Sequence, residues 1–140
     1  MVIEAKTGRI IIERLTKGKD LLEEIKRVAE STRVNGGFLA VIGALSKVVF
    51  GFYEEKRYKK VEMDGPLEIL SCIGNISESE GEKIIHAHIT VSNNKGEAYG
   101  GHLLPGCIID PTAELIIIEG ENLTLKRKLD EETGLKLLET

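Results

Sequence analysis

The sequence has no tryptophan or glutamine, and its 140 residues include only two cysteines, three prolines and 4% aromatic residues. Two cysteines, Cys72 and Cys107, are too few for a disulfide framework or a cysteine zinc finger, so we expect two buried free thiols. No apolar run approaches the roughly 20 residues that a membrane helix needs, and the N-terminus has no signal-peptide pattern. We therefore expect a cytoplasmic protein that does not enter a membrane.

The remaining composition is typical of a globular domain. Hydrophobic residues make up 41% and charged residues 30% of the chain, which excludes a disordered chain. No repeat, low-complexity tract or linker divides the sequence, so we expect residues 1–140 to form one domain. The net charge of −4 argues against a strongly basic nucleic-acid-binding surface. Abundant Glu, Lys and Ile give a bias typical of thermophile proteins.

One segment has the period of a helix. Between Lys19 and Thr32, one amphipathic stripe carries Leu21, Leu22, Ile25, Val28 and Ala29. Acidic residues precede basic ones along this segment, which suits the helix dipole, and the Asn-Gly-Gly sequence at 35–37 ends it. We expect no other helix.

The rest of the chain is typical of short strands bounded by Gly, Asn, Asp, Pro or charged residues. We expect strands at residues 9–15, 38–45, 48–53, 58–63, 67–74, 83–92, 97–104, 113–118 and 123–128. Hairpin-length turns join most of them. The predicted fold class is therefore α+β, an antiparallel β-sheet of about seven or more strands with one main helix packed on it.

All three histidines lie in one predicted hairpin. Residues two apart in a strand share a face, so His86 and His88 point away from the apolar residues between and beside them. A three-residue loop at 94–96 pairs His88 with His102, whereas a four-residue loop would turn His102 to the apolar face. The first register keeps both faces consistent, and we expect it.

Three imidazoles converging from adjacent strands match a zinc site that leaves one position open for water. We expect Gly100 and Gly101 to leave space beside His102 for the metal and a small-molecule ligand. Three nitrogen ligands also suit iron, nickel or copper, so the expected cofactor is zinc or another divalent metal. The alternative is three surface histidines that share a polar face by chance.

Two carboxylates are candidate catalytic bases beside such a metal. Glu114 follows the turn at 110–112, and Glu68 follows Gly65-Pro66. With either base, a metal-bound water of lowered pKa would make the protein a zinc-dependent hydrolase or lyase. The alternative is that both are solvated strand residues.

Several motifs occur in the order and spacing of a known family. They are residues 38–46 (FLAVIGALS), 65–71 (GPLEILS), 74–76 (GNI), 86–88 (HAH), 99–103 (YGGHL) and 112–114 (TAE). Through these motifs, nearly the whole chain resembles the plant-and-prokaryote-conserved (PPC) domain. It resembles the stand-alone prokaryotic members of this family, which are related to the domain of plant AT-hook proteins. The resemblance implies an antiparallel sheet with a helix, a homotrimer, and a metal at His86, His88 and His102.

The same resemblance implies a DNA-binding, regulatory or interaction module, because plant members carry AT-hooks and prokaryotic members are described as DNA-binding. This sequence has no Arg-Gly-Arg-Pro hook, is acidic, and has Pro66-Leu67 where plant members have Arg-Phe. We therefore expect direct DNA binding to be weak or absent without a partner. Composition adds to the trimer expectation, since one helix cannot cover all of Phe38, Leu39, Val41, Ile42, Val49, Phe50 and Phe52.

Overall fold

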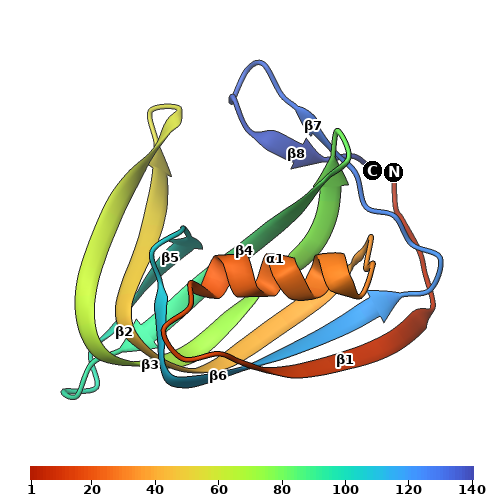
Figure 1. Cartoon of the computed structure of the whole chain (residues 1–140). Coiled ribbons are helices and arrows are strands. Elements are labelled where there is room, and N and C mark those ends of the chain that lie inside the picture. Colours follow the sequence, from red (N-terminus) through yellow and green to blue (C-terminus); the bar gives the residue numbers. More distant parts are fainter.

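The computed structural model describes residues 1–140 and contains one helix among eight strands (Figure 1). In chain order the elements are β1 (Thr7–Leu15), α1 (Leu21–Ser31), β2 (Gly37–Glu54), β3 (Arg57–Ser79), β4 (Glu82–Ser92), β5 (Ala98–Leu103), β6 (Ile108–Gly120), β7 (Arg127–Leu129) and β8 (Lys136–Leu138). Every strand pair is antiparallel. The predicted antiparallel sheet with a single helix is confirmed.

Six strands form the main sheet in the order β1-β6-β2-β3-β4-β5, and β7 with β8 forms a separate hairpin. The last strand, β5, also pairs with β2 through Phe50–Leu103 and Gly51–His102. Strands β2 to β5 therefore close into a four-stranded barrel, while β6 and β1 continue from β2 as an open extension. The sequence pattern did not predict this closure, because it joins strands separated by about 50 residues.

The strand count also differs from expectation, because β2 and β3 are single strands of 18 and 23 residues. We expected each to be two strands, interrupted near residues 46–47 and 64–66. The structure instead has one register shift there, between Leu45 and Lys47 of β2, which pair with Leu67 and Asp64 of β3. Such bulges bend a strand without ending its pairing. The last expected strand, 123–128, is replaced by the β7–β8 hairpin.

The helix covers one face of the sheet (Figure 1). Its N-cap is Asp20, whose side chain accepts a hydrogen bond from the backbone of Glu23 at 3.1 Å. Four of the five predicted stripe residues, Leu21, Ile25, Val28 and Ala29, are fully buried against the sheet. This interface and the barrel interior make one continuous hydrophobic core.

The opposite face of the sheet, which we call the outer face, is apolar and exposed. Cross-strand pairing aligns it in two rows. One row runs Ile10, Ile118, Phe38, Asn75 and His86, and the other runs Ile12, Ile116, Ala40, Ile73 and His88. All the Ile and Phe members of these rows are exposed. Both apolar rows end at a histidine of β4.

Of the seven apolar residues expected to exceed what the helix can cover, only three are exposed: Phe38, Ile42 and Phe52. The other four, Leu39, Val41, Val49 and Phe50, are buried within the chain. All four belong to the single core that the helix and the barrel interior share, and barrel closure pairs Phe50 with Leu103. No helix of the structure has the length and apolar character to cross a membrane.

Candidate metal centre

The β4–β5 hairpin pairs His88 directly with His102, as the three-residue loop predicts. The backbone N–H of Asn93 donates to the Glu97 carbonyl at 3.1 Å and closes the loop. The Asn93 side chain accepts from the backbone of Lys95 and Glu97, which holds the turn from inside. The predicted register is confirmed.

The three histidines meet as one cluster. His86 lies two residues before His88 on the same face of β4, and one ring nitrogen from each of the three residues lies within 4.8 Å of the others. Ring centroids are 5.2 to 5.7 Å apart. His86 and His102 are half-buried, and His88 is exposed. The cluster therefore presents three nitrogen donors at the surface of the barrel.

Glycines around the cluster allow close approach of backbones. A Cβ at Gly101 would lie 2.6 Å from the Gly51 carbonyl oxygen, and one at Gly100 would lie 2.3 Å from the Ile89 carbonyl oxygen. We expected both glycines to leave space for a metal and its ligand. That expectation is wrong, because neighbouring strand backbone occupies the space and the glycines permit tight pairing.

Burial favours the neutral form of two of the rings, those of His86 and His102. Burial, with smaller contributions from His86, His88 and Arg127, lowers the pKa of His102 to about 4. The pKa of His86 is also lowered, first by burial and then by Arg127 and His88. The Tyr58 ring stacks on His102 with centroids 4.4 Å apart and adds to its desolvation. At neutral pH these rings are therefore in the form that a metal ion requires.

One atom of the cluster lacks a partner. Nδ1 of His102 is buried and has no hydrogen bond to any protein group. Buried polar atoms almost always have a partner, so this nitrogen is suited to an external ligand such as a metal ion. Tetrahedral Zn–N bonds would place two ligand nitrogens about 3.4 Å apart, within reach of small ring rotations from 4.8 Å. The residues thus fit a metal ion in type and proximity.

Arg127 of β7 adjoins the cluster and was missed in the sequence. Its Nη2 lies 3.3 Å from Nδ1 of His86 and donates to Oδ1 of Asn75 at 2.8 Å. Its Nε donates to the Ser77 hydroxyl at 2.8 Å, and Nη1 to the Lys136 carbonyl at 2.9 Å. No sequence signal marks this position, since Arg127 lies 25 residues beyond His102 on a hairpin whose docking is non-local.

The β7–β8 hairpin packs over this end of the barrel. The Tyr53 hydroxyl donates to the Thr133 carbonyl at 2.5 Å, which ties the hairpin turn to β2. Between hairpin and barrel is a cavity of about 220 Å³ whose polar lining residues are His86, His102, Arg127, Lys136 and Tyr58. In Figure 1 this hairpin lies near the tips of the β2–β3 and β3–β4 hairpins. His86 and His102 of the cluster thus border a cavity that is partly open to solvent.

The two carboxylates considered as catalytic bases are elsewhere in the chain. Glu114 of β6 pairs with Ile42, three strands away from β4, or about 14 Å at ordinary strand spacing. Glu68 pairs with Ser92, four residues along β4 from His88, or about 13 Å. Neither lines the cavity. Within one chain they lie apart from the histidines.

Both cysteines are free and buried, as expected, and neither belongs to the cluster. Burial raises the pKa of Cys72 to about 12 and that of Cys107 to about 11. The Cys107 thiol lies 3.2 Å from the Val49 carbonyl, to which it donates. These protonated thiols act as core side chains.

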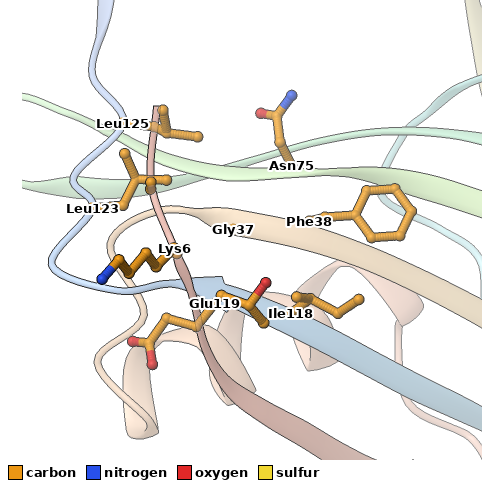
Figure 2. Close-up of a pocket in the computed structure, with 11 residues that line it drawn as sticks. Lys6, Gly37, Phe38, Asn75, Ile118, Glu119, Leu123 and Leu125 are labelled. Carbon is orange, nitrogen blue, oxygen red and sulfur yellow. The ribbon is translucent and has the colours of Figure 1, made fainter. Parts of the chain in front are cut away.

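A wider cavity of about 340 Å³ lies beside the first residues of β2 (Figure 2). Phe38, Asn75 and Ile118 line it together with charged Lys6 and Glu119. The Glu119 carboxylate is already paired with Arg9, at 2.6 and 2.8 Å. This cavity therefore offers no free set of metal-binding or catalytic groups, and the chemistry is concentrated at the histidines.

Fold and site together define a small antiparallel β-barrel protein with one packed helix and a candidate three-histidine metal centre. The family model of the Plants and Prokaryotes Conserved (PCC) domain, the family that we abbreviate PPC, matches residues 2–121. The chain belongs to this family, and the resemblance seen in its motifs is confirmed.

Solved structures share the fold across the whole chain. A PPC protein from Pyrococcus horikoshii is 32% identical, with a TM-score of 0.91 over 100% of this chain and 98% of that one. A protein from Archaeoglobus fulgidus described as metal-containing is 33% identical, with a TM-score of 0.90 over 100% and 99%. A Ralstonia eutropha protein, whose name suggests but does not establish DNA binding, is 26% identical, with a TM-score of 0.83 over 92% and 90%.

Among curated proteins, the chain is similar to the bifunctional protein GlmU of a Synechococcus strain. The two are 32% identical over 122 residues, which are 86% of this chain and 18% of that protein. This chain therefore spans about a fifth of the length of the curated relatives that it matches.

Proposed function

We propose that this protein is a homotrimeric, metal-binding PPC-domain module that holds one zinc or other divalent ion per chain on His86, His88 and His102. The unpartnered, buried Nδ1 of His102 within a cluster of three ring nitrogens carries this proposal. The Archaeoglobus fulgidus neighbour, described as metal-containing, adds support. The expected compartment remains the cytoplasm, and the whole chain is taken as one domain.

The residues of the chain have distinct tasks in this site. The β4–β5 pairing sets the positions of His88 and His102, and the Tyr58 ring holds His102 in place by stacking. Arg127 and Asn75 form the polar surroundings of His86. When bound, the metal supplies a Lewis acid with at least one position open to small molecules.

The outer face supports the homotrimer. Its exposed side chains include Ile10, Ile12, Phe38, Ile116 and Ile118. They are cross-strand neighbours and form continuous rows, unlike the scattered single apolar residues of an ordinary surface. Association of copies through this face removes the apolar surface from water. Because both rows end at β4 histidines, the interface and the metal site adjoin.

A zinc-dependent hydrolase or lyase is the second candidate, favoured by the cavity beside His86 and His102. Its weakness is that no carboxylate lines this cavity. Glu114 shares the outer face with Ile42, so in a trimer it would face a neighbouring copy and could serve that copy's site. Glu68, far from the histidines in its own chain, is less suited to this role.

The test is elemental analysis and zinc titration of the purified protein, compared with two variants of β4. His88→Ala removes an exposed donor and should lower zinc affinity at least 100-fold while the fold is retained. Thr90→Ala, on the same face two residues further, is the matched control and should bind zinc as the native protein does. Unchanged zinc stoichiometry and affinity in His88→Ala would contradict the proposal.

A further inference from the structure

The cavity between the barrel and the β7–β8 hairpin carries only positive charge. Arg127 and Lys136 line it and no acidic residue does, but Lys136 is paired at 4.0 Å with Glu80 outside the lining, so Arg127 is the unpaired charge. No carboxylate oxygen lies within 4.0 Å of the Arg127 guanidinium, although eight other ion pairs form in the chain. A half-buried guanidinium without a counter-ion is unusual, because burial of an unpaired charge is unfavourable.

The hydrogen bonds of Arg127 leave part of its donor capacity free. Three of its five N–H groups donate to oxygens of Ser77, Lys136 and Asn75. Of the other two, one on Nη2 donates to Nδ1 of His86 at 3.3 Å, and the second N–H of Nη1 has no acceptor. The bonds hold the guanidinium in a fixed orientation beside the histidines, with one N–H of Nη1 left for a ligand.

A bound divalent metal increases the charge imbalance. The three histidines are neutral ligands, so the metal brings two positive charges that no protein carboxylate balances, beside the positive charge of Arg127. Such a site favours an anion that contacts both the metal and Arg127. This step rests on the proposed metal site.

The rest of the lining defines the kind of anion. Ile84, Ile85, Leu135 and Leu137 contribute apolar surface, and the volume of about 220 Å³ corresponds to about seven water molecules. A fully hydrated inorganic anion would leave the apolar lining unused. We propose that this cavity binds a small organic carboxylate, with its charged group between Arg127 and the metal and a short apolar chain against the hairpin.

The experiment uses the full chain loaded with Co²⁺, whose visible absorption reports ligands that join the metal. Butyrate is the probe, and acetate, butyramide and inorganic phosphate are compared with it. Butyrate should change the spectrum saturably and bind more tightly than acetate, because its longer chain contacts Leu135 and Leu137. Butyramide should bind weakly. Tighter binding of phosphate than of butyrate would overturn the carboxylate assignment.

Two substitutions in β7 distinguish direct contact between Arg127 and the ligand from a general effect of positive charge. Arg127→Ala should weaken butyrate binding about 10- to 100-fold, the range for a lost charged hydrogen bond. Lys128→Ala removes an equal charge from the adjacent, exposed position and should leave butyrate binding unchanged. Equal effects of the two substitutions, or none in Arg127→Ala, would refute the proposal.

Arg127 also holds the hairpin, so an independent variant is needed. Leu137→Ala changes no charge and should reduce the preference for butyrate over acetate several-fold. An unchanged preference would exclude the hairpin as the binding wall. Failure of Co²⁺ to bind would refute the metal site itself, whereas Co²⁺ binding without a butyrate response would refute only the carboxylate.

Discussion

Replacement of Gly101 tests whether barrel closure positions the metal site. A Cβ at this position would lie 2.6 Å from the Gly51 carbonyl oxygen and 2.9 Å from the Phe50 ring. Ordinary contact begins at 3.4 Å, so β5 must move from β2 by about 0.8 Å (3.4 less 2.6). Only two residue pairs join these strands, and one of them contains His102. The shift therefore acts directly on a metal ligand.

Gly101→Ala should have two measurable consequences. Overpacking of this size costs about 1–3 kcal/mol, which corresponds to a fall in Tm of roughly 3–10 °C for a chain of this length. Zinc affinity should fall about 100-fold or more, since even changes to groups behind the ligands cost about 10- to 100-fold. Urea unfolding of the metal-free protein measures the first effect, and zinc titration against a competing chelator measures the second.

The matched control is Gly8→Ala in β1, outside the barrel. There a Cβ would meet its nearest neighbour at 3.3 Å, so the adjustment is only about 0.1 Å. This variant should lose less than about 1 kcal/mol and keep its zinc affinity. If Gly101→Ala binds zinc within threefold of the native protein and unfolds at the same urea concentration, the β2–β5 closure does not position His102.

Three further predictions concern the core, the outer face and DNA. The Cys72 thiol ionises in the unfolded chain from about pH 9 but stays protonated in the fold until about pH 12. The free energy of unfolding should therefore fall between these pH values by up to about 1.4 kcal/mol per pH unit. In urea titrations at several pH values, Cys72→Ala should show a weaker dependence of this free energy on pH. Ile118→Glu should shift the light-scattering mass from trimer to monomer, whereas Leu129→Glu, exposed on β7, should not; a native monomer at micromolar concentration would contradict the trimer. Random duplex DNA should bind weakly at physiological salt, since three chains carry a charge of about −12 (three times −4), and sub-micromolar affinity there would show that a local basic surface outweighs this charge.

The helix and the histidine hairpin could be predicted because their determinants are local. The apolar stripe from Leu21 to Ala29 identifies the helix, and the whole stripe lies within the 11 residues of α1. The His88–His102 pairing follows from a three-residue loop and from alternation on two adjacent strands. Each depends on residues close in sequence, so a pattern of period 3.6 or 2 contains the necessary information.

Strand ends were predicted less well, because a pattern cannot distinguish a break from a bulge. Gly65-Pro66 and Ser46-Lys47 have the composition of turns, yet β2 and β3 pass through both positions. Pairing on both sides continues across the irregularity and holds the strand together. Whether such a segment bends or ends depends on the neighbouring strand.

The sequence alone determined the antiparallel α+β class, the single helix and the clustering of three histidines on one face, because each arises from contacts within a helix or a hairpin. Only the tertiary structure decided the barrel closure, the placement of Arg127 beside His86 and the separation of Glu68 and Glu114 from the histidines. These features join segments tens of residues apart. They depend on the packing of the whole sheet, which no local pattern of residue types specifies.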